Sequence, residues 1–240
     1  MNFYDQVVLK LIHHPGEIWH VTSLAIRIGG IGPGDTVITS PFTFFATGGA
    51  IARLGATPVF MDIQPADFNL DPAGVRRFLE GSDTRYQALG VHPEQVKAII
   101  PVHLYGQMAD MEEFLAISKE FSIPLVEDAA QAIGAKQAFS DGRTVGAGVE
   151  GDFGCFSFYV TKNLSTGEGG MIISKKKKAI QELRTLSLHG MDRDAWKRYG
   201  KSGFKHYDIV RAGFKFNMSD IHASIGIHQL NNIEKAWKKR

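Results

Sequence analysis

The chain has 240 residues, 44% of them hydrophobic and 22% charged, and 27 basic against 25 acidic side chains give a formal net charge of +2. This composition excludes fibrous, disordered and low-complexity proteins, and the near-neutral charge gives no electrostatic reason to expect nucleic acid or a membrane surface as a partner. A single cysteine, Cys155, excludes an intramolecular disulfide and favours a cytoplasmic location, and we find neither the roughly 20 apolar residues that span a bilayer nor a signal-peptide layout.

From residue 35 onward, short β-branched runs alternate with segments of helical periodicity. Strands are expected at 36–39, 58–62, 97–102, 124–128, 152–159 and 171–173, and helices at 45–54, 71–80, 110–121 and 219–230. Asp71 before Pro72 marks a helix start, with Asp71 as the N-cap. The alternation predicts an α/β domain whose mostly parallel sheet is covered by helices on both faces, with ligands bound at the carboxyl ends of the strands.

Several motifs carry little functional weight. Gly146-x-Gly148-x-x-Gly151 has the dinucleotide-binding spacing, but it leads into a strand instead of opening a helix. Residues 137–151 around it are expected to form a surface excursion, and 29–34 a tight turn between a helix and a strand. The nine histidines are scattered, and no metal site is predicted because His13 and His14, being adjacent, cannot share one helix face.

Two other features are better explained by structure than by chemistry. Lys175–Lys178 follow an expected strand without interleaved aromatic residues, so a solvated face is favoured over an anion or nucleic-acid site. Cys155 lies within a strand pattern, in which Phe153, Cys155, Ser157 and Tyr159 share one side, and is expected to be a buried packing residue.

Polar side chains at two expected strand ends suggest a reaction. Asp128 ends a hydrophobic strand and is followed by Gln131, and Lys162 follows the end of another strand. A lysine and an aspartate at neighbouring strand ends suit pyridoxal phosphate (PLP) chemistry, in which the lysine forms a Schiff base and the carboxylate keeps the pyridine nitrogen protonated. From spacing alone, an ordinary ion pair at a sheet edge is the more common explanation.

Longer blocks of sequence decide between a PLP site and an ordinary ion pair. They are residues 32–35 with 41–47, then 55–62, 102–107, 127–132, 151–154 with 161–164, and 213–220. The blocks match, in the same order, those of the DegT/DnrJ/StrS family of PLP-dependent nucleotide-sugar aminotransferases, which the sequence resembles from about residue 24 to 235. The resemblance implies the large domain of the aspartate-aminotransferase fold, fold type I of the PLP enzymes.

The resemblance also implies roles for individual residues. Lys162 is expected to bind the cofactor and to move the proton during transamination, Asp128 to pair with the pyridine nitrogen, and Gln131 to hydrogen-bond near the ring hydroxyl. Phe44 occupies the aromatic position that stacks on the ring, although a core aromatic is an equally good interpretation of it.

Three further positions concern the cofactor phosphate. Ser157 is expected to contact it through its hydroxyl, and Lys215 and Asn217 are nominated to reach the phosphate in the neighbouring subunit. The resemblance therefore implies a homodimer that shares two active sites.

The sequence departs from the family at both ends. The family's Ser-Gly-Thr-like phosphate turn has no counterpart in residues 16–24, where Thr22 or Ser23 aligns poorly. The family continues beyond residue 240 into a small domain. We therefore expect an atypical segment at 1–23, a PLP-binding large domain at 24–240, and a small domain that is largely missing.

The predicted reaction is PLP-dependent transamination of a keto nucleotide-sugar with glutamate as amino donor, in amino-sugar or polysaccharide biosynthesis. A sugar dehydratase of the same family would carry histidine in place of Lys162. A catalytically incomplete fragment, or a non-catalytic PLP-binding or regulatory member, is the alternative that the two departures leave open.

Overall fold

The computed structural model describes residues 10–12, 17–191 and 208–239, with side chains described from residue 22 onward. The strands are β1 (Lys10–Ile12), β2 (Thr36–Thr39), β3 (Thr57–Phe60), β4 (Val96–Ile100), β5 (Val126–Asp128), β6 (Lys136–Ala138), β7 (Thr144–Gly146), β8 (Phe153–Ser157) and β9 (Gly170–Ile173). The helices are α1 (Glu17–Ile28), α2 (Ala46–Ala52), α3 (Pro72–Leu79), α4 (Met111–Phe121), α5 (Lys177–Leu186) and α6 (Asp220–Trp237), with 3₁₀ turns η1 (Gln87–Leu89), η2 (Pro93–Gln95) and η3 (Leu104–Gly106). His13 and His14 lie outside the described residues.

One twisted sheet runs through the molecule. β3, β2 and β4 pair in parallel in that order, β5 pairs in parallel with β8, and β9 then β1 follow with antiparallel pairing. Parallel bridges between Ile99 and Leu125 and between Val102 and Asp128 join β4 to β5. The strand order is therefore β3-β2-β4-β5-β8-β9-β1, and the predicted mostly parallel sheet is confirmed.

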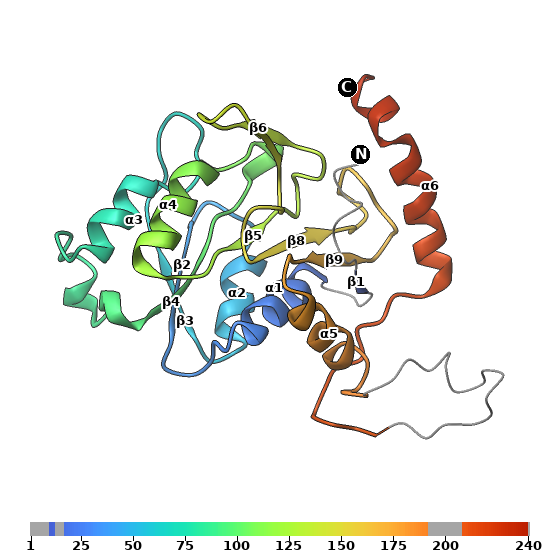
Figure 1. Cartoon of the computed structure of the whole chain (residues 1–240), viewed down its shortest axis with the longest axis horizontal. Helices are drawn as coiled ribbons and strands as arrows, with labels where there is room; N and C mark the ends of the chain where they lie inside the picture. Colours follow the sequence, from blue (N-terminus) through green and yellow to red (C-terminus); the bar gives the residue numbers. More distant parts are fainter. Residues whose placement is uncertain (1–9, 13–16, 192–207, 240) are drawn as a thin grey trace.

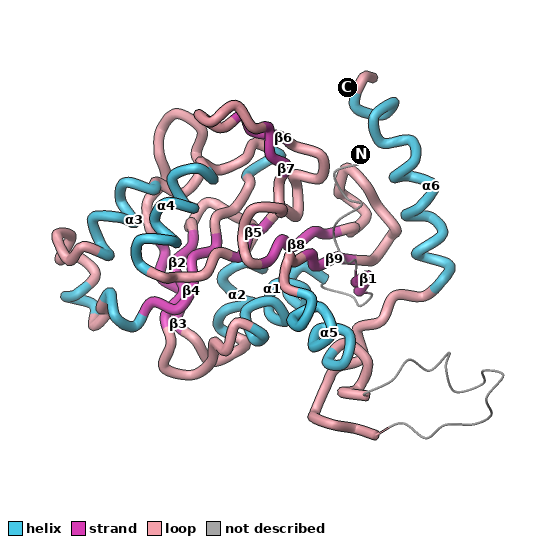
Figure 2. Tube along the Cα trace, viewed as in Figure 1, coloured by secondary structure: helices cyan, strands magenta, loops and turns pink. Residues whose placement is uncertain are grey.

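Helices cover the two faces of this sheet (Figures 1 and 2). α3 and α4 pack together on one face, while α1 packs against α2, α5 and the strands β8 and β9 on the other. Two hydrophobic clusters lie between sheet and helices, one containing Phe78 and Phe114 and the other Ile51 and Leu183. A βαβ alternation produces this arrangement because each crossover helix must bury its apolar stripe on a sheet face.

The strands supply both clusters through their alternation of side chains. In β2, Val37 joins the α1 cluster and Ile38 the α3–α4 cluster. In β8, Cys155 and Phe156 divide in the same way, as expected for a strand whose successive side chains point to opposite faces. The predicted buried cysteine is confirmed.

The expectation of a surface excursion at 137–151 is wrong in part. β6 and β7 form an antiparallel hairpin there, and Phe139, Val145 and Ala147 are buried in the α3–α4 cluster. Glycine and polar residues hide this packing in the sequence because the three apolar side chains are isolated and show no strand period over so short a run.

The strand expected at 152–159 is shorter in the structure, where β8 ends at Ser157. All five residues of β8 are buried, as expected for a sheet that is covered on both faces. Tyr159 lies beyond the strand and is exposed. A central strand of a parallel sheet is buried in this way.

The helix expected at 219–230 is confirmed and extends to Trp237, but its apolar residues are not core residues. Ile221, Ile225, Ile227 and Leu230 are exposed, and none of its residues is buried. α6 stands at the edge of the molecule (Figure 1), where Ile233 packs against the α3–α4 cluster and Gln229 accepts a hydrogen bond from the Ser165 backbone at 2.8 Å. Among the described residues, no helix combines the length and apolar character needed to cross a membrane.

Close backbone packing around β8 gives a test of this fold. A Cβ on Gly154 would lie 1.9 Å from the carbonyl oxygen of Gly148. We expect Gly154→Ala to lower the free energy of unfolding by about 3 kcal/mol, because the loop must move away from the strand. Urea denaturation measures the change, with Gly32→Ala as the control, since the nearest atom to its added Cβ is 4.0 Å away. Equal stability of the two variants would contradict this packing.

Candidate active site

Asp128 lies at the carboxyl end of β5 and is 3% exposed. Its Oδ2 accepts a hydrogen bond from the Thr47 hydroxyl at 2.7 Å, and its Oδ1 accepts one from the Ala130 N–H at 3.2 Å. Burial raises the pKa of Asp128, while these hydrogen bonds and the positive charge of Lys162 oppose the rise. A desolvated carboxylate of this kind favours a cationic partner in the neighbouring cavity.

Lys162 lies in the turn that follows β8 and is half-buried. Its backbone N–H bonds to the Tyr159 carbonyl at 2.9 Å. Burial lowers the pKa of the Lys162 amine below its usual value of 10.5, and the negative charge of Asp128 opposes this shift. The lowered pKa increases the fraction of uncharged amine, which is the nucleophilic form.

A cavity brings four of the predicted residues together, and its lining includes Phe44, Asp128, Gln131 and Lys162. Phe44 is 59% exposed, so it is not a core aromatic. An adjoining hollow shares Gln131 and Lys162 with this cavity and adds Tyr105 to its lining. The parallel order β2-β4-β5-β8 places the loops that carry these side chains at one edge of the sheet.

Gln131 has one end of its amide already engaged. Its Oε1 accepts a hydrogen bond from the Tyr105 N–H at 2.8 Å. The side-chain NH₂ is therefore the end that can donate to a bound group in the cavity.

The other predicted residues lie outside the lining of the cavity. Ser157 is buried at the end of β8, with its Oγ 3.3 Å from the Tyr159 nitrogen. Lys215 is exposed and bridges to Leu188, while Asn217 is partly buried with a side-chain oxygen that has no hydrogen-bond partner among the described residues.

Thr22 and Ser23 do not replace the missing phosphate turn. Thr22 is fully buried beside Cys155, and the Ser23 hydroxyl donates to the Ala50 carbonyl at 3.2 Å. Both side chains belong to the packing between α1, α2 and β8.

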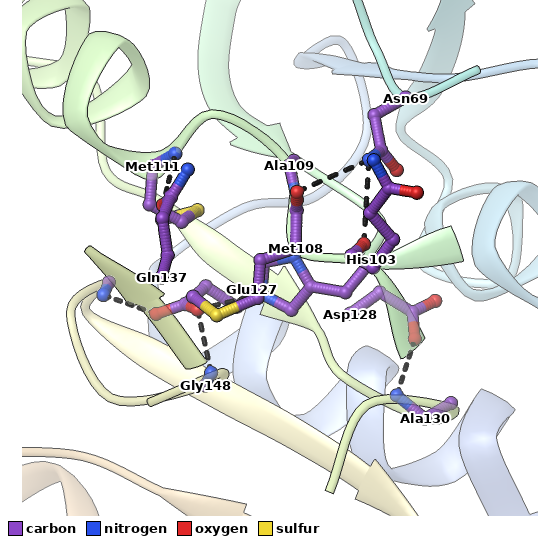
Figure 3. A network of polar contacts seen from close by, with 12 residues as sticks. Asn69, His103, Met108, Ala109, Met111, Glu127, Asp128, Ala130, Gln137 and Gly148 are labelled. Carbon is purple, nitrogen blue, oxygen red and sulfur yellow. Dashed lines mark hydrogen bonds and ion pairs between the residues drawn. The ribbon is translucent and has the colours of Figure 1, made fainter. Parts of the chain in front are cut away.

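The sequence analysis missed a buried pair beside the cavity, formed by Glu127 and His103 (Figure 3). Both side chains are 0% exposed, and His103 Nε2 lies 2.8 Å from Glu127 Oε2. The same carboxylate accepts hydrogen bonds from the Gly148 N–H at 2.7 Å and the Gly151 N–H at 2.6 Å. Two glycines of the Gly146-x-Gly148-x-x-Gly151 motif therefore bind a carboxylate of the protein itself.

The hydrogen bonds also assign the tautomer of His103. The Ala109 N–H donates to His103 Nδ1 at 3.1 Å, so Nδ1 is an acceptor and the proton resides on Nε2. His103 is thus a neutral donor to an ionised Glu127, whose carboxylate receives three N–H groups. One signal in the sequence could have revealed this pair, namely two consecutive acidic residues at the end of a hydrophobic strand, since the one facing the core must find donors.

The sequence profile of the DegT/DnrJ/EryC1/StrS aminotransferase family matches residues 20–240. A pleiotropic regulatory protein of Geobacillus stearothermophilus is 50% identical over 218 residues, which are 90% of this chain and 50% of that protein. GDP-perosamine synthase of Caulobacter vibrioides is 36% identical over 212 residues, 88% of this chain and 50% of the synthase.

The fold is shared with solved structures of the same family. The structure of S. venezuelae DesV in complex with a ketimine intermediate aligns with a TM-score of 0.76 and 28% identity, covering 95% of this chain and 53% of DesV. The chain spans about half the length of the curated relatives it matches.

Because its pKa is lowered, Lys162 should begin to react with an acylating reagent at a lower pH than an ordinary lysine. In the folded chain the rate should reach half its maximum at a lower pH than in the urea-unfolded chain, because burial disfavours the charged amine. Since the unfolded chain binds more protons in this window, the contribution of Lys162 to stability increases with pH there. Peptide mass mapping after short labelling pulses measures the rate for this lysine.

The variant Asp128→Asn extends the same test. It removes the negative charge that opposes the lowering of the Lys162 pKa, so the pH of half-maximal acylation of Lys162 should fall further. Identical midpoints in the folded and unfolded wild-type chain would contradict the assigned environment of the amine.

The buried carboxylate predicts a large stability effect. Glu127→Ala should lower the free energy of unfolding by about 3 kcal/mol, because three N–H donors lose their acceptor in a site without solvent. Urea denaturation measures it, and Glu94→Ala, at an exposed position, should change stability by less than about 0.5 kcal/mol. A Glu127→Ala chain as stable as the control would refute the role assigned to the pair.

Proposed function

This chain belongs to the DegT/DnrJ/EryC1/StrS aminotransferase family, and we propose that the protein transfers an amino group to a keto nucleotide-sugar with PLP as cofactor and glutamate as donor. The matched family is described as an aminotransferase family, and its solved members include PLP and PMP forms of a putative sugar aminotransferase from Streptococcus pneumoniae. The observation that carries the proposal is the cavity lined by both Asp128 and Lys162 at the ends of adjacent parallel strands.

The residues of the cavity fit PLP. Asp128 is a buried carboxylate whose raised pKa favours a cationic partner, and a protonated pyridine nitrogen is such a partner. Phe44 offers an exposed ring at the cavity, where it can lie against the face of a planar group. The NH₂ of Gln131 can donate to a ring oxygen.

When bound, PLP supplies an electrophilic carbon and an electron sink for the amino acid and sugar carbons. Lys162 then has two tasks, to hold the cofactor covalently through Nζ and, once released from that bond, to take and return a proton at the same atom. Its lowered pKa suits both tasks because forming the covalent bond and taking the proton both require the uncharged amine. Asp128 would pair with the cationic ring nitrogen of the bound cofactor.

The substrate and assembly are proposed from the relatives and the resemblance. GDP-perosamine synthase supports a nucleotide-linked sugar as the substrate class. Lys162, where a dehydratase of the family would carry histidine, favours transamination. Lys215 and Asn217 lie outside the lining of the cavity. We propose that they contact the cofactor phosphate of the partner subunit in a homodimer, and that this homodimer is cytoplasmic.

A regulatory protein is the second candidate function. It is favoured by the relative with 50% identity, whose name is pleiotropic regulatory protein. A regulatory protein of this family could keep the cofactor site and lack turnover, so binding and catalysis must be measured separately.

The test is reduction of the protein with borohydride after incubation with PLP. We expect peptide mass mapping to find a pyridoxyl group on Lys162, because this amine combines a lowered pKa with a place beside Asp128. Lys162→Arg should carry no such group and lose amino transfer by at least about a hundredfold, the contribution of a positioned proton-transfer group.

The outcomes separate the candidates. A pyridoxyl group with consumption of glutamate supports the aminotransferase, and the same group without turnover supports the regulatory protein. Modification spread over surface lysines such as Lys97 or Lys119, with none on Lys162, would reject both.

A further inference from the structure

Three exposed aromatic side chains lie together beside the cavity, and we refer to Phe42, Phe68 and Tyr105 as the aromatic cluster. Their exposed fractions are 42%, 52% and 78%. Phe42 meets Phe68 with ring centroids 6.0 Å apart at 87°, and Tyr105 at 6.5 Å and 89°. Edge-to-face contacts cover few ring faces, so most faces of the cluster remain open to a planar ligand.

Two members of the cluster have unfavourable backbone conformations. Phe68 has a φ of 62° and Tyr105 a φ of 52°. Bulky side chains rarely adopt this left-handed region, and glycine or asparagine would do so at lower cost. Strain of this kind persists only where surrounding structure enforces it, and it is concentrated at ligand sites.

Two side-chain amides hold the segments that carry these conformations. Asn69, which is 1% exposed and follows Phe68, accepts the Leu104 N–H at 3.1 Å and donates to the Met108 carbonyl at 3.3 Å (Figure 3). Gln131 accepts the Tyr105 N–H at 2.8 Å. The amides on either side of the cluster thus hold the turn at Tyr105 and link it to the loop of Phe68.

The position of the cluster connects it to the reacting group. Tyr105 lines the hollow that also contains Gln131 and Lys162. A ligand that reaches Lys162 through this hollow passes the ring of Tyr105, and a second planar part of that ligand would meet the cluster.

We propose that the aromatic cluster is a subsite that stacks on the nucleobase of a nucleotide-linked ligand. The link to a nucleotide-linked ligand rests on the proposed function, and stacking supplies the chemistry, since every nucleobase has a flat π face that aromatic side chains bind. A contact between copies of the chain is the main alternative. Three side chains alone provide far less than the roughly 800 Å² per partner of a stable interface.

Binding is tested on the full chain by calorimetry with UDP and GDP, and with inorganic pyrophosphate as the ligand without a base. We expect both nucleotides to bind more tightly than pyrophosphate. Tyr105→Gly and Phe68→Gly should each weaken nucleotide binding by about tenfold and leave pyrophosphate binding unchanged. Tyr105→Phe keeps the ring and should keep the affinity.

The same glycine variants separate a ligand role from a structural role. Because glycine relieves the positive φ, both variants should melt at or above the wild-type temperature while they bind nucleotide less well. Ser122→Gly is the matched control, since Ser122 has a φ of 56° at the end of α4. It should melt higher and bind nucleotide as the wild type does.

Other results would overturn the subsite. Equal affinity of the wild type for nucleotides and pyrophosphate, unchanged affinity in the glycine variants, or lower melting temperatures for both would each do so. A change of sedimentation coefficient in the variants with unchanged affinity would assign the cluster to an interface between copies. Nucleotide binding that persists in a chain without a pyridoxyl group on Lys162 would refute the proposed function and leave the subsite standing.

Discussion

The buried carboxylate of Glu127 is the interaction on which the arrangement of the site depends. It receives N–H groups from His103, Gly148 and Gly151, and so ties the end of β5 to the segment after β4 and to the loop before β8. Ionised carboxylates are seldom buried because of their desolvation cost, and three donors offset that cost here. Three segments far apart in the sequence are therefore fixed around one residue.

Because side chains alternate along a strand, this constraint also positions the residues that line the cavity. Glu127 and Asp128 are consecutive in β5, so their side chains point to opposite faces of the sheet. Glu127 is anchored on the side of α4 and the 146–151 loop, and Asp128 faces α2, where Thr47 donates to it. Asp128 has fewer donors than Glu127, and burial raises its pKa. The two neighbouring carboxylates thus differ in their surroundings, since Glu127 is held by three N–H donors and Asp128 lines the cavity with Lys162.

Local patterns predict much of the fold but only part of the site. The strand at 36–39 and the helix capped by Asp71 follow from β-branched runs and from capping chemistry, which depend on near neighbours. The positions of Asp128 and Lys162 follow from the general placement of ligand sites at strand ends. The roles predicted for them rest on the resemblance of long, ordered sequence blocks to the family. The partners of Glu127 lie at positions 103, 148 and 151, and no local pattern indicates that these segments meet. The hairpin of β6 and β7 was missed for the same reason, because Phe139 and Val145 are buried by distant segments.

Two regions border the cavity: a buried base, which contains Glu127 and His103, and an exposed rim, which contains Phe68 and Tyr105. The base stabilises the fold, whereas the rim contains unfavourable backbone conformations. At the base, Glu127 and His103 have their hydrogen-bonding groups satisfied, which stabilises the fold. At the rim, Phe68 and Tyr105 have positive φ values, and the amides of the buried Asn69 and the partly buried Gln131 hold the turn at Tyr105. Gln131 belongs to both regions, since it lines the cavity beside Lys162 and fixes the backbone of Tyr105. The Gln131 amide therefore joins the two regions, because its oxygen is the acceptor of the Tyr105 N–H while its NH₂ remains available in the cavity.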